Sequence, residues 1–291
     1  MTTVCCVGVA TLDRIAIVDR VPGSDERTVA EPFVVSGGGP AATAAVTLAR
    51  LGIDVAFCGV VGDDEAGASV RDGLAVEGVD VTALQMRPGA RTPESMILVE
   101  RGTGARTIIT TPSIAPDAES VPLDVAWLHA DQTGYAAVRD ARGPRISIDG
   151  GNDIADLRLA GVALYAPTLP ALRARFGDED EEALLTAAAA GAETVVATDG
   201  GDGAIVLASG AITRVPAVEV DVVSTMGAGD VFHGALLAGI VSGLDPVESA
   251  RRAAFVAARS CTALDGRSGI PTLAEVDDAM NASAVPREKN A

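Results

Sequence analysis

The sequence predicts an α/β protein: a three-layer α/β/α sandwich with a small antiparallel β-sheet beside it as a lid. Short apolar runs alternate with helical stretches along most of the 291 residues, which is typical of a mainly parallel sheet covered on both faces. Two segments, at about 14–35 and 92–112, interrupt this alternation with strand-like runs joined by tight turns. We therefore expect a single domain over residues 1–291, with these two segments forming the lid.

The elements of the sandwich follow a regular order. The first strand is predicted at residues 4–9, and the loop after it includes Asp13. Gly38 and Gly39 precede an alanine-rich helix. The remaining periodic segments predict a helix at residues 65–77 and strands at residues 55–61, 125–129, 145–148, 162–165 and 194–197.

Each lid segment is predicted to contribute two strands. In the first segment, residues 15–18 and 33–35 are apolar and are separated by turns that contain proline and glycine. In the second, residues 95–99 and 107–110 flank Arg101-Gly102-Thr103-Gly104, which has the composition of a hairpin turn. Antiparallel pieces inserted into an α/β chain indicate a small sheet that stands off the main domain.

The charge of the chain excludes several classes of partner. Its formal net charge is −18, whereas nucleic acids and anionic membranes bind basic surfaces, so we expect neither as a partner. Lys289 is the only lysine, and the chain has no Gly-Lys-Ser/Thr sequence from which to build a Walker A loop. Any bound phosphate must therefore be held by backbone N–H groups, by arginine or through a metal ion.

The cysteines and the apolar runs predict a cytoplasmic protein. Cys5, Cys6, Cys58 and Cys261 have neither the spacing of a disulfide framework nor that of a zinc site. The chain starts with a strand-like run rather than with a signal peptide. No apolar run approaches the roughly 20 residues that cross a bilayer.

The segment from Ser224 to Phe232 gives the strongest indication of chemistry. A strand end is followed by Gly227-Ala228-Gly229, then by Asp230 and an apolar helix. Helix N-termini have unpaired N–H groups and a partial positive charge, so these three amides would hold a transferring phosphoryl group. Asp230 would accept the proton of an attacking hydroxyl. The alternative interpretation is structural, with glycine serving the turn and Asp230 complementing the helix dipole.

The same segment resembles the C-terminal signature of the ribokinase-like (PfkB) carbohydrate kinases, whose usual form is Asp-Thr-Thr-Gly-Ala-Gly-Asp. Gly38-Gly39-Pro40-Ala41-Ala42 and Ala49-Arg50-Leu51-Gly52 are similar to the N-terminal signature of the family. Val61-Gly62-Asp63-Asp64 and Gly78-Val79-Asp80 resemble two further family segments, so the resemblance spans almost the whole chain. It implies the ribokinase-like fold and ATP-dependent phosphorylation of a hydroxyl on a small sugar.

The resemblance implies residues at the sugar end of the site. Asp13 would hold two sugar hydroxyls, and Gly38 and Gly39 would let the sugar lie against the backbone. Thr43 stands where many members carry an asparagine near the sugar. Asp131, at another strand end, occupies a position where relatives often place a substrate carboxylate.

At the ATP end, the resemblance implies that Thr198, Gly200 and Gly203 hold the phosphates and the ribose, and that Asp230 is the general base. A plain hairpin turn would also explain the glycines of that turn. Magnesium would accompany ATP, and a homodimer formed through the lid is expected. The family element Asn-x-x-Glu, linked to magnesium, should fall near residues 166–171, but neither residue is present. Ser224 and Met226 also depart from the signature, so no monovalent cation is expected.

Three stretches are similar to the sulfofructose kinases within this family. They are residues 37–46, 230–236 and 266–271. A sulfonate needs cationic or amide donors, and Arg27 on the lid is one candidate, with Arg101 and Arg106 as others. Fructose, a fructose phosphate or a keto-deoxy sugar acid would equally suit the resemblance.

Two other functions remain open at this point. A nucleoside kinase of the same fold would stack its acceptor on aromatic side chains, and aromatic residues make up only 3% of this chain. A non-catalytic sugar or nucleotide sensor would account for the missing Asn-x-x-Glu element, although such a sensor would not need Asp230. His233 follows Asp230 by three residues, so it is either a partner of the base or a packing residue.

Overall fold

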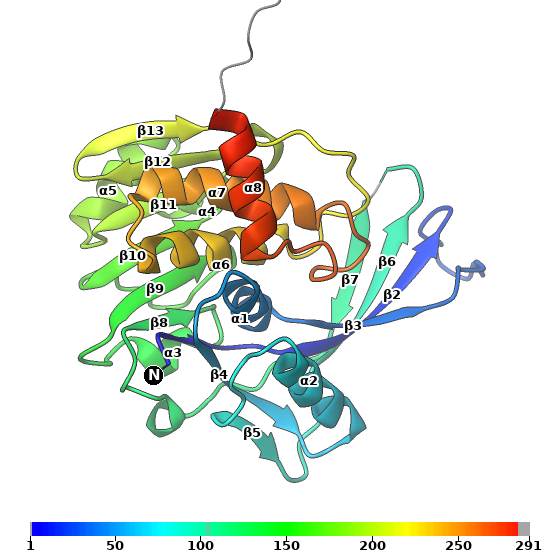
Figure 1. Cartoon of the computed structure of the whole chain (residues 1–291). Coiled ribbons are helices and arrows are strands. Elements are labelled where there is room, and N and C mark those ends of the chain that lie inside the picture. The colour runs from blue at the N-terminus through cyan, green and yellow to red at the C-terminus, as the bar shows by residue number, and fades with distance from the viewer. Residues whose placement is uncertain (1, 104, 285–291) are drawn as a thin grey trace, which may run out of the picture.

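The computed structural model describes residues 2–103 and 105–284 and places their strands in two sheets (Figure 1). The main sheet has the strand order β13-β12-β11-β10-β9-β8-β1-β4-β5. Its strands are parallel from β11 to β5, and β12 and β13 extend one edge in antiparallel pairs. These strands are β1 (Val4–Val7), β4 (Val55–Gly62), β5 (Leu84–Arg87), β8 (Trp127–Ala130), β9 (Arg145–Gly150), β10 (Val162–Pro167), β11 (Thr194–Thr198), β12 (Ala204–Ala208) and β13 (Ala211–Val215).

Helices cover both faces of the main sheet, as the alternation of side chains along its strands requires. In β1, Val4 and Cys6 join the core under α1, α6 and α7, whereas Cys5 and Val7 join the core under α3, α4 and α5. The predicted three-layer sandwich is confirmed. The helices are α1 (Pro40–Arg50), α2 (Glu65–Val76), α3 (Tyr135–Val138), α4 (Leu169–Phe176), α5 (Asp180–Ala189), α6 (Ala228–Val241), α7 (Pro246–Ser260) and α8 (Leu273–Ala284).

Helix α6 is the central element of its layer. Every residue from 231 to 239 is buried, because the helix is apolar on all sides and packs between α1, α7 and the sheet. Gly234 permits the close approach to α1, since a Cβ there would lie 2.7 Å from the carbonyl oxygen of Ala44. This packing fixes the start of α6 relative to the sheet.

The lid is a second sheet of four strands in the order β3-β2-β6-β7. Its two outer pairings are antiparallel, and the central pairing of β2 with β6 is parallel. The lid begins earlier than expected, because the chain enters β2 only three residues after β1 ends, and Asp13 therefore lies in a strand rather than in a loop. The strands are β2 (Thr11–Val18), β3 (Val34–Gly38), β6 (Glu94–Glu100) and β7 (Arg106–Thr110).

The two faces of the lid differ in their surroundings. Ile15 and Ile97, which are paired in register, are buried in a small cluster with Met226 of the main domain. On the opposite face, the register places Val35 and Met96 on either side of Arg14, and both apolar side chains are exposed. One face of the lid therefore belongs to the interior, and the other leaves apolar side chains in solvent.

The antiparallel edge strands β12 and β13 and the short strand β5 were not predicted from the apolar runs. Among the described residues, no helix is long and apolar enough to span a membrane. Lys289, on which the exclusion of a Walker A loop depends, lies outside the described residues.

Candidate active site

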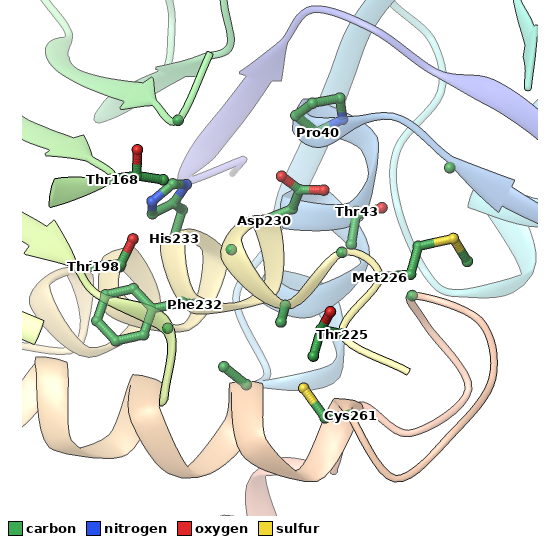
Figure 2. Close-up of a pocket in the computed structure, with 18 of the residues that line it drawn as sticks. Pro40, Thr43, Thr168, Thr198, Thr225, Met226, Asp230, Phe232, His233 and Cys261 are labelled. Carbon is green, nitrogen blue, oxygen red and sulfur yellow. The ribbon is translucent and has the colours of Figure 1, made fainter. Parts of the chain in front are cut away.

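A cleft of about 990 Å³ lies between the lid and the carboxyl ends of the main-sheet strands, where α6 begins. Of the thirteen residues that the sequence predicts for the site, all but Arg27 and Asp131 line this cleft. Figure 2 shows lining residues from several elements: Thr43 of α1, Asp230 and His233 of α6, Thr198 at the end of β11 and Thr168 directly after β10. The cleft therefore joins segments that are distant in the sequence.

At one end of the cleft, Asp13 and the glycine pair form a tight unit. The hydroxyl of Thr11 donates to Asp13 Oδ1 at 2.7 Å. A Cβ on Gly38 would lie 2.0 Å from Asp13 Oδ2, and Gly39 has a φ of 92° with its Cβ position 2.4 Å from the carbonyl oxygen of Val9. Both positions need glycine, and the chain lies close enough to Asp13 for one small ligand to contact backbone and carboxylate together.

Arg267 is a buried cation behind this end of the cleft, and the sequence interpretation gave it no role. Its Nη2 donates to the carbonyl of Gly38 at 2.9 Å, and its Nε donates to the hydroxyl of Thr43 at 3.3 Å. Burial lowers its pKa to about 10, so the guanidinium remains charged at neutral pH and offsets the charge of Asp13. Burial raises the pKa of Asp13, whereas Thr11, Ser95 and Arg267 lower it.

At the start of α6, the backbone amides are open to the cleft. Gly227, at the N-cap, has a left-handed φ of 70°, and no side chain caps the helix. The amide of Ala228 donates to the carbonyl of Thr225 at 3.3 Å, whereas those of Gly227, Gly229 and Asp230 have no partner among the described residues. A Cβ on Gly229 would meet nothing within 4 Å, so glycine here leaves an open space above free N–H groups. Such a space suits an anion.

Asp230 is half-buried next to these amides, and Figure 2 shows its carboxylate pointing toward Pro40 at the start of α1. Removal from water and the neighbouring charges of Asp149 and Asp131 raise its pKa to about 7, against the opposing effects of His233 and Arg267. A carboxylate with a pKa near neutrality is well suited to take up a proton in a reaction at physiological pH.

Asp149 and His233 form a buried ion pair beside this carboxylate. His233 Nδ1 lies 3.0 Å from Asp149 Oδ2, and the two side chains are only 2% and 3% exposed. Asp149 comes from the end of β9, where its Oδ1 accepts a hydrogen bond from the amide of Gly151 at 2.8 Å. The sequence raised His233 as a partner of the base, but it gave no indication of Asp149.

The other end of the cleft is formed where β11 ends. Thr198 closes β11, and a short turn at Gly200–Asp202 leads into β12. Gly203 is required by packing, because its φ is 98° and a Cβ would lie 2.1 Å from the carbonyl oxygen of Val215. Gly200 has a φ of 53°, and nothing lies within 4 Å of its Cβ position. Of the two predicted glycines, Gly200 therefore leaves space that a ligand could enter, whereas Gly203 does not.

Two predicted site residues need correction. Asp131 is fully buried behind the cleft wall, where its Oδ2 accepts from the amide of Val9 at 2.8 Å and its Oδ1 from that of Gly134 at 2.9 Å. Burial raises its pKa to about 6. Asp131 thus organises the backbone between β1 and α3 instead of contacting a substrate. Arg27 lies exposed on the connection between β2 and β3, away from the cleft lining.

A two-layered helix cover, a β-sheet lid and a carboxylate beside free helix amides together define a small-molecule kinase of the ribokinase-like class. The chain belongs to the pfkB family of carbohydrate kinases, whose sequence profile matches residues 1–139 and 138–273. It is accordingly an ATP-dependent phosphotransferase that acts on an alcohol group.

Relatives and solved structures agree with this membership. A fructokinase from Escherichia coli is 30% identical over 281 residues, covering 86% of this chain and 90% of that protein. A ribokinase from Bacillus subtilis is 24% identical, covering 97% of this chain and all of that protein. Ribokinase from Thermotoga maritima superposes with a TM-score of 0.85 at 22% identity, covering 97% and 100% of the two chains. Arabidopsis thaliana ribokinase, solved with ribose and ATP, superposes with a TM-score of 0.81 at 22% identity, covering 96% of this chain and 98% of that chain.

Proposed function

We propose that this enzyme transfers the γ-phosphoryl group of ATP to a hydroxyl of a small sugar, and that Asp230 is the general base. The carrying observation is the position of Asp230, next to free helix amides and between the two ends of one cleft. The Asp13 end would bind the sugar, and the Thr198 end would bind the nucleotide.

The residues of the cleft suit each part of this reaction. As the acceptor oxygen forms its bond to the γ-phosphorus, its proton passes to the Asp230 carboxylate, and the bond to the bridging oxygen of ADP breaks. The free amides at Gly227, Gly229 and Asp230 would hold the equatorial oxygens of the moving group. The lid would exclude water, which otherwise competes as acceptor.

Magnesium would enter this cleft with the nucleotide. The part of the chain that the structure describes contains no cluster of three or more histidine, cysteine, aspartate or glutamate side chains that could hold a metal ion. Residues 166–171, near which the resemblance places the Asn-x-x-Glu element, contain neither asparagine nor glutamate. The residues present fit a hydrated Mg²⁺ bound mainly by ATP phosphates, where it would neutralise their charge.

The lining of the cleft favours a sugar over a nucleoside as acceptor. Phe232 is the only aromatic residue among the described lining residues, and Figure 2 shows it beside Thr198, at the proposed nucleotide end. The acceptor end therefore offers no ring for stacking a base. Arg106 of β7 also lines the cleft, and its guanidinium donates to the hydroxyl of Thr225. Its charge supports a ketose with an acidic group, such as a sulfo-sugar or a sugar phosphate.

A homodimer through the outer face of the lid forms part of the proposal. Val35, Met96 and Ile109 are 53%, 51% and 63% exposed, and the register of the lid strands places them in one row. A second copy would cover this row, and sedimentation at several concentrations tests that. The four cysteines are buried and unpaired, which supports a cytoplasmic enzyme.

The decisive experiment measures ADP release with neutral ketoses, ketose phosphates and sulfo-ketoses, in wild type and in Asp230→Asn. We expect one of these sugars to stimulate ADP release, and Asp230→Asn to lower kcat about 1,000-fold while ATP binding persists. Turnover close to wild type in Asp230→Asn would refute the role of the base. Stimulation by nucleosides alone, or by no acceptor, would instead favour the nucleoside kinase or the sensor.

A further inference from the structure

Three carboxylates gather at the floor of the cleft, where Asp149 and Asp230 line it and Asp131 is buried behind it, and few cations oppose them. Asp149 and Asp131 both raise the pKa of Asp230, and the cations that lower it are His233 and Arg267. Arg267 lies on the sugar side, where its guanidinium is bound to Gly38 and Thr43. His233 is on the same helix as Asp230, three residues further on and hence on the same side.

The surroundings of His233 favour a charged ring. Asp149 lies 3.0 Å from Nδ1, and Nε2 is buried without a partner among the described residues. Burial lowers the pKa of His233. The charge and hydrogen bond of Asp149 and the charge of Asp230 raise it by more, so on balance the pKa is raised. Burial raises the pKa of Asp149, but His233 and His129 lower it on balance.

The other elements packed against α6 bring no competing cation to this position. From β8, His129 is held by the hydroxyl of Ser147, 2.9 Å from its Nδ1, and burial lowers its pKa to about 4, so it is neutral. Asp131 follows the same strand. Helix α1 contacts α6 at Gly234 through Ala44 and Thr47, and α7 contacts it at Gly239 through Ser249. None of these three residues is charged.

We propose that His233, paired with Asp149, is a positioning residue: a positive charge at the cleft floor that favours the ionised form of Asp230 near neutral pH. The inference rests on the proposed role of Asp230. The ring of His233 is only 2% exposed, so in this proposal it acts on the reaction through Asp230.

A double-mutant cycle on the pH profile tests this inference. In His233→Gln, Asp149 remains charged without its partner, so the acid limb of kcat/KM should move up by about one pH unit. Activity should fall roughly tenfold at pH 6.5 and recover at pH 9. In the Asp149→Asn/His233→Gln double variant, both charges are gone, and the limb should return close to that of wild type.

The control is His129→Gln, which changes the other histidine of the same buried region. It should leave the acid limb of the kcat/KM profile at the same pH as in wild type. A limb that stays at the wild-type pH in His233→Gln, or a loss that high pH does not rescue, would overturn the inference. Failure of the proposed function would look different, because Asp230→Asn would then retain turnover.

The charge of His233 can also be read without any turnover. The chain has only two histidines, so imidazole NMR signals can be assigned by comparison with His129→Gln. We expect the His233 ring to titrate above 6.5 in wild type and below 6.5 in Asp149→Asn. A ring that is already neutral at pH 6 in wild type would refute the proposal even if the variants fold poorly.

Discussion

The wall of the cleft formed by α6 is buried along almost its whole length, whereas the wall formed by the lid is largely open to solvent. Every residue of β7 is exposed, and the lid holds to the main domain through a small cluster that includes Ile15, Ile97 and Met226. Groups that need fixed geometry, Asp230 and the free amides, lie on the firm wall. Arg106, which we propose helps to select the acceptor, lies on the lid wall, whose strands are more exposed and which is therefore the wall more easily moved.

After the loss expected for Asp230→Asn, the largest effect should come from filling the open space at Gly229 on the α6 wall. In Gly229→Ala, the added methyl group would occupy the space above the free amides, and we expect kcat to fall about 100-fold. The fold should not suffer, because nothing lies within 4 Å of the added Cβ and alanine is the better helix former by about 0.8–1 kcal/mol. Steady-state kinetics and denaturant unfolding measure the two effects separately.

Gly73→Ala in α2 is the matched control, since Gly73 is also helical and its Cβ position is also empty. It should gain similar stability and keep full activity. If Gly229→Ala is as active as Gly73→Ala, then the open space at the start of α6 does not hold the moving phosphoryl group.

On the α6 wall of the cleft, the features whose residues lie close together in the sequence could be predicted from the sequence. Gly227, Gly229 and Asp230 occur within four residues, and the helix start that gives them their function is set by the same residues. Gly38 and Gly39 are similar, because two adjacent glycines before a helix already indicate a close approach. Asp13 was expected at the same end of the site from the family resemblance, but its close contact with Gly38 could be seen only in the structure.

What escaped prediction depends on contacts between distant segments. Arg267 donates to the carbonyl of Gly38, which is 229 positions away in the sequence. Asp149 in β9 contacts His233 in α6, and these two elements are also far apart in the sequence. Asp131 was misplaced because a carboxylate at a strand end gives the same pattern whether it points into the cleft or back toward the next loop. The four backbone amides that donate to its carboxylate, those of Val9, Ala41, Thr133 and Gly134, are brought together only by the fold.

The pH dependence of turnover probes the charge balance of the firm wall. Because burial and Asp149 raise the pKa of Asp230 to about 7, the base is lost by protonation as the pH falls through that value. We expect kcat/KM to be level above pH 8 and to fall about tenfold for each unit below pH 6.5. A profile that stays flat down to pH 5 would contradict a base with a raised pKa.

On the lid wall, Arg106→Gln should weaken acceptor binding more than it slows the chemical step. We expect KM for an acidic ketose to rise roughly tenfold, with kcat and the KM for a neutral ketose little changed, since one charge-assisted contact is lost. Arg101→Gln is the control from the same sheet, because Arg101 pairs with Asp19 and Glu31 instead of facing the cleft. If both substitutions raise KM for the acidic ketose equally, then Arg106 contributes only to the overall positive charge of the lid and makes no direct contact with the acceptor.

The smallest effect tests whether the two walls differ in stability as their packing suggests. Ile97→Val in the lid and Ile148→Val in the main sheet remove the same methyl group from sites that are 1% and 0% exposed. Each should cost about 1 kcal/mol locally. If the lid opens without the main domain, Ile97→Val speeds hydrogen exchange of the β6 and β7 amides about fivefold, whereas Ile148→Val leaves the exchange of those amides unchanged. Equal acceleration of these amides by both substitutions would mean that the lid and the sandwich unfold together, so that closure over the substrate would have to be a movement of a rigid sheet rather than its local loosening.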